Sequence, residues 1–223
     1  MGSYYTGWRA RHYNICWRSF TKRTLAETVA MIDVAKLQNI ASQMGRPPRV
    51  LDVACGTGVL LSMLIELIPD VEAYGVDAST DMLVQARLAL RGQLHVQLER
   101  ARLGDGETAH LPYAPQSFDL ITCTNALHDM SNPVGVLAEL GRLLAPEGQL
   151  IVEDYARHGP PFLWALFEWL ARRIEGGHEH AYTLSEAQAL CMQAGLCVVC
   201  EHAFTLDWLW HGWVLRLSVV PDR

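Results

Sequence analysis

Two glycines in a short turn are the residues of this chain best suited to hold a ligand. A mostly apolar run at residues 50–53 predicts a buried parallel strand, and helix-forming residues follow at 59–65. A strand, a tight turn and a helix together direct backbone N–H groups and a helix N-terminus at a bound molecule. Because Gly56 and Gly58 carry no Cβ atoms, a ligand can lie directly against the main chain there.

The spacing of this turn argues against a nicotinamide cofactor. The dinucleotide fingerprint G-x-G-x-x-G/A requires a third small residue three positions after the second glycine. This chain has Leu61 at that position. A nicotinamide oxidoreductase is therefore a disfavoured hypothesis.

An acidic residue, Asp77, stands at the end of the next predicted strand. Residues 71–77 form that strand, and Asp77 ends it about 20 residues past the glycine turn, where a carboxylate can accept both ribose hydroxyls of an adenosine. Ser79 or Thr80 is suited to cap the helix that follows. The pair of strands thus predicts a site for an adenosine-containing ligand.

These two segments resemble a known family. Residues 52–58 are similar to motif I of class I S-adenosylmethionine (SAM) methyltransferases, and residues 77–83 are similar to the D-x-S-x-x-M-L segment of the same family. The resemblance implies that Asp77 binds the ribose and that Ala78 and Met82 lie beside the adenine. The cofactor-binding residues that it implies in the two segments are Asp52, Ala54, Gly56, Gly58, Asp77, Ala78 and Met82.

A third segment resembles the family's Gly-Asp-Ala-x-x-Leu-Pro-Phe stretch, in which the acid and the next residue meet the adenine. Counting back from the Leu-Pro pair at 111–112 assigns these roles to Glu107 and Thr108, whereas counting forward from Gly104 assigns the acid's role to Asp105. We favour Glu107, because exchange of Asp for Glu is a smaller change than a loop insertion.

Catalytic candidates follow the next two predicted strands. Residues 117–125 form a strand buried on both faces, and ligands of open α/β sheets bind beyond such strand ends, so Asn125 and His128 are expected beside the methyl donor. The Ser-Phe-Asp…Leu-His pattern here resembles ubiquinone/menaquinone-type methyltransferases. His128 titrates near neutrality and could deprotonate a phenol or hold a substrate, and a packed histidine is the alternative. Asp129, its sequence neighbour, is expected to point away, whereas Asp154 at the end of a fifth strand could orient or deprotonate an acceptor or form a rim salt bridge.

The first 45 residues predict helices that cover the sheet. Aromatic and apolar residues recur there at helical spacing, which predicts two or three helices in a segment too short to be a domain. In similar small-molecule methyltransferases such a segment closes over the donor, and the resemblance places Tyr13 there, with Asn14 where an Asp is common. The predicted organisation is a helical cap at 1–45 and a SAM-binding domain at 46–223.

The order of elements predicts the fold class. Strands and helices alternate from residue 49 to about 195, and two strands, about 196–206 and 208–219, follow without a helix between them. This pattern predicts an α/β fold with a doubly wound, mostly parallel sheet and a terminal antiparallel hairpin. The resemblance implies a Rossmann-like sheet of seven strands.

The composition limits the kinds of partner that we expect this protein to bind. With 24 acidic and 18 basic residues the net charge is −6, which argues against a nucleic-acid partner. We expect no integral membrane segment and no signal peptide, and hence a cytoplasmic protein. The six cysteines are expected in the core, and no metal site is expected, because Cys197 and Cys200 lie three apart in a predicted strand and should face opposite sides.

The sequence therefore predicts a SAM-dependent methyltransferase. The expected acceptor is a small, largely apolar metabolite of the aromatic, quinone-like or polyketide type, as used in secondary metabolism, and a homodimer is the oligomer considered. The alternative is a SAM-binding enzyme of the same fold that cyclises or rearranges its substrate without methylating it.

Overall fold

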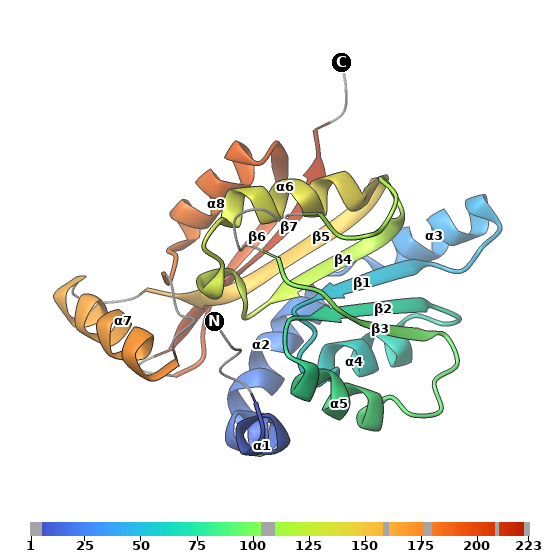
Figure 1. Cartoon of the computed structure of the whole chain (residues 1–223). Coiled ribbons are helices and arrows are strands. Elements are labelled where there is room, and N and C mark those ends of the chain that lie inside the picture. The colour runs from blue at the N-terminus through green and yellow to red at the C-terminus, as the bar shows by residue number, and fades with distance from the viewer. Residues whose placement is uncertain (1–5, 104–109, 158–160, 176–179, 208–209, 221–223) are drawn as a thin grey trace.

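A computed structural model of the chain describes residues 6–103, 110–157, 161–175, 180–207 and 210–220 (Figure 1). In this part of the chain one sheet of seven strands runs in the order β3-β2-β1-β4-β5-β7-β6. Pairing is parallel from β3 through β5, and β7 is antiparallel to both β5 and β6, which confirms the predicted fold class. The strands are β1 (Arg49–Val53), β2 (Glu72–Asp77), β3 (Val96–Arg100), β4 (Phe118–Thr124), β5 (Leu144–Ala156), β6 (Leu196–Thr205) and β7 (His211–Val219).

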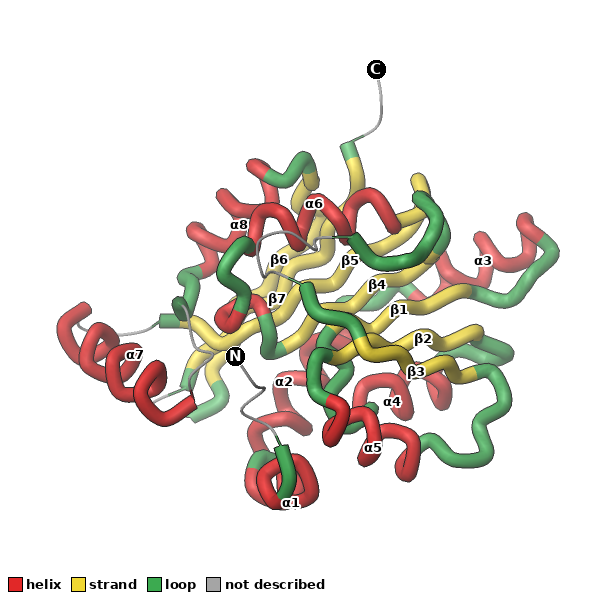
Figure 2. Tube along the Cα trace, viewed as in Figure 1, coloured by secondary structure: helices red, strands yellow, loops and turns green. Residues whose placement is uncertain are grey.

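Helices cover both faces of the sheet (Figure 2). One face carries α6 and α8, and the other carries α2, α3 and α4. The helices are α1 (Trp8–Cys16), α2 (Arg18–Ala30), α3 (Val34–Met44), α4 (Val59–Leu67), α5 (Thr80–Ala89), the short 3-10 helix η1 (Leu127–Asp129), α6 (Pro133–Leu143), α7 (Pro161–Glu175) and α8 (Leu184–Gln193).

Alternating residues of the central strands feed two cores. Leu150 and Val152 of β5 pack with α6 and α8, whereas Ile151 between them packs with α2, α3 and α4. Successive side chains of a strand point to opposite faces, so a doubly covered strand is apolar throughout. Leu25 of α2 and Leu37 of α3 are buried in the second core, so two of the three N-terminal helices are part of the sheet's packing.

Contacts between neighbouring segments set the bounds of two elements. Strand β5 begins at Leu144, directly after α6, because Phe118 pairs with Leu144 before a register shift. Helix α8 is capped by Thr183, since the Thr183 hydroxyl accepts from the Glu186 backbone and the Glu186 carboxylate accepts in return. For α5, Ser79 is the N-cap.

The expectation for Cys197 and Cys200 is wrong in two respects. Val199 is an extra residue of β6 relative to β7, and the two cysteines pair with Arg216 and Ser218, which are two apart on β7. A bulge of this kind restores the pleat, so both cysteines lie on one face. Both cysteines are also exposed rather than in the core, and they lie on β6, the edge strand of the sheet.

Three other cysteines follow the prediction. Cys55, Cys123 and Cys191 are buried and free.

Within the described ranges no group of three or more His, Cys, Asp or Glu is arranged to hold a metal ion. None of the helices in those ranges combines the length and apolarity that crossing a bilayer requires.

Candidate cofactor and catalytic site

The turn between β1 and α4 is held in an unusual backbone conformation. Ala54, Gly56 and Gly58 have φ values of 58°, 53° and 78°. A Cβ atom on Gly58 would lie 2.9 Å from Leu90 Cδ1, so packing as well as φ requires glycine there. Ala54 adopts the left-handed conformation at a cost of about 1–2 kcal/mol. Such strain is typical of functional sites.

Asp77 ties this turn to the next strand end. Its Oδ2 accepts from the Gly56 backbone N at 2.9 Å, and its Oδ1 accepts from the Ser79 backbone N at 2.7 Å. Each carboxylate oxygen keeps a second lone pair, which is free to accept from a ligand hydroxyl. Burial raises the pKa of Asp77, and the two backbone bonds act in the opposite direction.

Met82 and Ala78 lie beside the glycine turn and Asp77. Met82 is buried, and its Cε would lie 3.4 Å from a Cβ atom on Gly56. Ala78 follows Asp77 directly and is half-buried. A glycine turn without Cβ atoms therefore lies beside the Asp77 carboxylate and the Met82 thioether, a set of groups suited to an adenosine.

Asp52 lies beneath the turn rather than on its surface. It is 1% exposed and accepts from Thr122 Oγ1 of β4 at 2.7 Å. Burial raises its pKa to about 7, and the nearby charge of Asp77 adds to the effect. Asp52 thus joins β1 to β4 under the site.

Helix α1 lies over the turn. Asn14 Oδ1 accepts from Thr57 Oγ1 at 2.6 Å, and the Gly7 backbone N donates to Asp81 Oδ2 at 2.6 Å. Burial raises the pKa of Tyr13, a hydrogen bond with Thr21 lowers it, and the charges of Glu153, Asp77 and Asp129 raise it further. Tyr13 therefore lies near acids of β5, β2 and η1. The Asn14 contact was not predicted, because it depends on a helix and a turn 43 residues apart.

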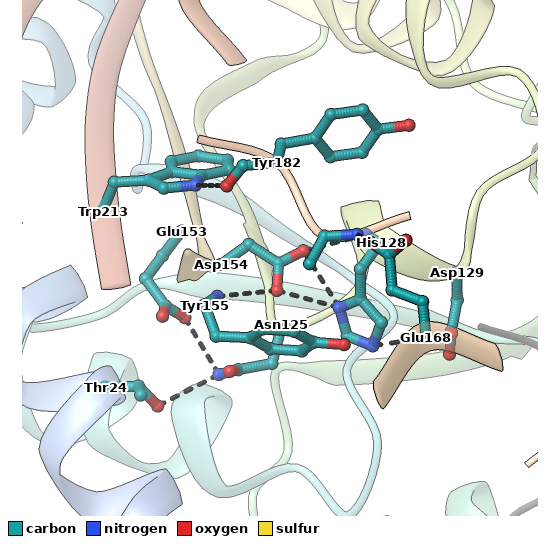
Figure 3. A network of polar contacts seen from close by, with 11 residues as sticks. Thr24, Asn125, His128, Asp129, Glu153, Asp154, Tyr155, Glu168, Tyr182 and Trp213 are labelled. Atoms are coloured by element: carbon teal, nitrogen blue, oxygen red, sulfur yellow. Dashed lines mark hydrogen bonds and ion pairs between the residues drawn. The ribbon is translucent and has the colours of Figure 1, made fainter. Parts of the chain in front are cut away.

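His128 and Asp154 form a dyad (Figure 3). Asp154 is 1% exposed, and His128 Nδ1 lies 2.8 Å and 3.0 Å from its two oxygens. The backbone N atoms of His128 and Tyr155 also donate to this carboxylate, at 2.9 Å and 2.8 Å. The contact with Asp154 favours the tautomer that carries its proton on Nδ1, and Nε2 is turned toward Asp129.

The expectation that Asp129 points away from His128 is wrong. The single turn of η1 curls the chain so that Asp129 Oδ1 lies 3.5 Å from His128 Nε2. The Asp129 side chain is 42% exposed, so it can leave Nε2 when another group approaches.

An aromatic cluster touches the dyad through Tyr155. The Tyr155 ring centroid lies 4.5 Å from that of His128 and 5.5 Å from that of Trp210. Trp164 of α7 and Phe20 of α2 also contact Trp210, at 6.5 Å and 5.6 Å. These rings come from four separate elements and form an apolar wall.

A second polar cluster lies on the opposite face of the sheet from the dyad. Figure 3 shows Glu153 pointing toward Asn125 and Thr24, whereas Asp154 points toward His128. Asn125 Nδ2 donates to Thr24 Oγ1 at 3.0 Å and to Glu153 Oε2 at 2.9 Å. Asn125 has a left-handed φ of 49°. Burial raises the pKa of Glu153 well above its ordinary value, the charge of Asp154 adds to this, and the Asn125 contact opposes it.

The residues expected to contact the adenine, which are Glu107, Thr108 and the alternative Asp105, lie outside the described residues. Glu153 and Thr24 were missed as site residues, because only the folded chain brings α2 against the end of β5. The signal that could have indicated Glu153 is an acidic residue in an otherwise apolar, doubly buried strand.

The fold is an open α/β sheet with a glycine turn and acidic side chains at its carboxyl edge, and comparisons with known proteins identify its family. A family model described as a methyltransferase domain matches residues 47–208. A demethylmenaquinone methyltransferase of Deinococcus radiodurans is 38% identical over 122 residues, which are 54% of this chain and 47% of that protein. The chain therefore spans about half the length of that relative.

Solved structures show the same fold. The YcgJ protein of Bacillus subtilis superposes with a TM-score of 0.64 at 20% identity, over 78% of this chain and 93% of that one. The [4+2]-cyclase SpnF superposes with a TM-score of 0.64 at 16% identity, over 78% and 76% of the two chains. The family match covers well over half of the chain, so the chain belongs to the class I SAM-dependent methyltransferases.

Proposed function

We propose that this chain is a SAM-dependent methyltransferase that acts on a small, largely apolar acceptor. The observation that carries the proposal is the contact between Asp77 and the Gly56 backbone at 2.9 Å, which joins an acid and a bare glycine turn into one surface. Family membership supports SAM as the cofactor. The proposed cofactor-binding residues are those named from the sequence, with Asp52 acting from below the turn.

The chemistry divides between the cofactor and the chain. When bound, SAM supplies a methyl group activated by its sulfonium. The chain's residues align the acceptor and exclude water, which is the task of the cap helix and the aromatic wall. His128 Nε2 is the atom placed to accept the proton of an acceptor hydroxyl, and Asp154 stabilises the imidazolium that results.

The aromatic wall supports an aromatic or quinone-like acceptor. Tyr155 lies next to His128, Trp210 packs on Tyr155, and Trp164 packs on Trp210, so one aromatic cluster reaches the dyad through Tyr155. The relative named as a demethylmenaquinone methyltransferase is consistent with that chemistry. The net charge of −6 supports a small molecule over a nucleic acid. A cytoplasmic location and a homodimer are part of the proposal, and size-exclusion chromatography with light scattering tests the latter.

Exchange of Asp77 tests cofactor binding. Asp77→Asn keeps the shape of the side chain but replaces a charged acceptor with a neutral amide, so the Kd for SAM should rise by roughly ten- to a hundredfold. Isothermal titration calorimetry measures this change. Asp70→Asn, in an exposed turn, is the control and should leave the Kd unchanged. Equal affinities for the two variants would remove Asp77 from the site.

A non-methylating cyclase is the second candidate function. The fold likeness to the [4+2]-cyclase SpnF favours keeping it. The two functions differ in cofactor consumption, because methyl transfer converts SAM to S-adenosylhomocysteine and cyclisation does not. Turnover of an acceptor with SAM intact would support the cyclase and contradict the methyltransferase proposal.

A further inference from the structure

Two cysteines of the edge strand β6 form a pair of surface thiols that the proposed function does not use. Cys197 and Cys200 are both free and exposed. Cys197 pairs with Ser218 of β7 and Cys200 pairs with Arg216, with Val199 as the extra residue between them. Residues two apart on a strand, and the residues opposite them, point to one face of the sheet. The bulge therefore makes the two thiols neighbours on one face, whereas the expectation of no metal site assumed that they face opposite sides.

The spacing of the two cysteines suits a shared ligand. Their partners Ser218 and Arg216, two apart on β7, are separated by about 7 Å along the strand. The cysteines are at least as far apart, because their own strand carries one residue more. This separation is at or beyond the upper limit for a disulfide, whose Cα atoms are roughly 4.4–6.8 Å apart. An ion between the sulfur atoms spans more, because each bond from sulfur to a metal such as zinc adds about 2.3 Å.

The pair lies on the other face of the sheet from the His128–Asp154 dyad. Arg216 pairs with Ile151 of β5, whose side chain is in the core that α2, α3 and α4 cover. Asp154 pairs with Trp213, which belongs to the core that α6 and α8 cover. A ligand of the two thiols would therefore be bound independently of a ligand at the dyad.

The polar neighbours on this face are engaged elsewhere. Arg216 Nη1 donates to the Met31 carbonyl oxygen at 3.3 Å, which directs the guanidinium toward the end of α2. His202, opposite Val214 on the same face, has its Nε2 3.6 Å from Glu27 Oε2. The pair therefore offers two sulfur donors at the protein surface.

We propose that Cys197 and Cys200 chelate one soft metal ion of low coordination number, for which Cu(I) is the probe. Thiolate sulfur is a soft ligand, and Cu(I) is among the ions that soft ligands select. Two thiolates satisfy Cu(I) in a nearly linear arrangement, whereas zinc in structural sites takes four ligands. The thiol protons pass to the buffer as the two sulfur–metal bonds form, and no electron is transferred.

Competition with a coloured chelator tests the proposal on the full chain. The reduced protein is titrated under nitrogen into the Cu(I) complex of bathocuproine disulfonate, and the loss of colour measures the transfer of the ion. The wild-type chain should take up one equivalent. Cys197→Ser and Cys200→Ser should each bind at least about a hundredfold more weakly, because a single thiol lacks the high effective concentration of a second one.

A relocated thiol is the matched control. Cys200→Ser combined with Glu201→Cys keeps the number of exposed cysteines on β6. Glu201 is the next residue of the strand and pairs with Leu215, so its side chain points to the opposite face. This double variant should bind Cu(I) as weakly as the single variants. Equal affinity of the double variant and wild type would overturn the proposal, because the number of thiols would then matter and their shared face would not.

Alkylation of the wild-type chain provides a measurement that needs no variant. Iodoacetamide should label Cys197 and Cys200 in the metal-free protein and neither of them after loading with one equivalent of Cu(I), as read by peptide mass mapping. Labelling of both cysteines after loading would overturn the proposal, and so would protection of only one. The affinity for SAM should be the same in the wild-type chain and in every variant of the pair, so failure of Cu(I) to bind leaves the proposed function standing.

Discussion

At the scale of single residues, the contact of Asp154 with His128 Nδ1 tests the base role proposed for His128. Asp154→Asn places an amide where Nδ1–H donates, which favours the other tautomer and removes the charge that stabilises an imidazolium. With any hydroxylated acceptor the rate of S-adenosylhomocysteine formation should fall by roughly 10²–10⁴-fold. The rate of the wild-type chain should decrease at low pH, and this decrease should be absent in Asp154→Asn.

His110 offers a matched control for this dyad. Its Nδ1 also lies 2.9 Å from a buried carboxylate, that of Glu139, but its side chain is 79% exposed. His110→Asn should leave the rate unchanged. If Asp154→Asn and His110→Asn gave the same rate, the dyad would have a structural role only.

Asp52 gives stability a dependence on pH. Its pKa in the folded chain is about 7, against an ordinary value of 3.8, so between these values the folded state holds a proton that the unfolded state has lost. The free energy of unfolding therefore falls as pH rises through this window, by about 4 kcal/mol from this group. In urea unfolding, Asp52→Asn should lose less stability than wild type between pH 4 and pH 8. A parallel pH dependence in the two proteins would contradict the assignment.

The residues that the sequence predicted and those that it missed differ in a physical way. Asp77 and Gly56 each stand at the end of a strand that its own local pattern marks, so their types and spacing indicated one site although 21 residues separate them. The contacts of Glu153 with Asn125 and Thr24 join separate elements, and no local pattern records them. The orientation of Asp129 depended on a single turn of 3-10 helix, which short-range periodicity does not resolve.

At the scale of elements, the contact between α1 and the glycine turn should control cofactor retention. Asn14→Ala removes the acceptor of the Thr57 hydroxyl, a loss of about 1 kcal/mol. The dissociation rate of SAM should rise about fivefold, measured by stopped-flow fluorescence of the tryptophans. Asn39→Ala in the exposed part of α3 is the control. An unchanged rate in Asn14→Ala would show that α1 does not retain the ligand.

The order and type of the elements were predictable, and several of their details were not. Alternating apolar strands and amphipathic helices predicted the parallel sheet and the final antiparallel pair. The early start of β5 and the bulge at Val199 depend on how neighbouring strands pair, which is decided across the sheet. Register between distant strands leaves little trace in a single strand's sequence.

At the scale of the whole molecule, the three N-terminal helices are unequal. Leu25, Ile32 and Leu37 of α2, α3 and their connection are buried in the sheet's core, and Asp33 and Gln149 exchange two hydrogen bonds of 2.9 Å. In α1, by contrast, Trp8 and Ile15 are exposed. The proposed boundary at residue 45 therefore divides one packed body, so α1 alone behaves as a detachable cap in our interpretation.

Truncation tests this division. Removal of residues 1–17 should leave cooperative thermal unfolding intact and weaken SAM binding. Removal of residues 1–45 uncovers several fully buried apolar side chains, at a cost of about 1.5–3 kcal/mol each, and should abolish cooperative unfolding. Circular dichroism melts of the two truncated chains measure the difference. A cooperative melt of the shorter chain would support the helical segment 1–45 as a separate unit.

The position of β7 has a consequence for how the chain is made. This strand is the last of the sheet in sequence, yet it lies between β5 and β6 and pairs with both along nearly its whole length. Until the ribosome has released residues 211–219, β5 has an open edge and β6 has no neighbour to bond. The sheet of a nascent chain therefore stays incomplete through most of synthesis, and stalling before Trp213, a fully buried residue, should leave a chain that depends on chaperones.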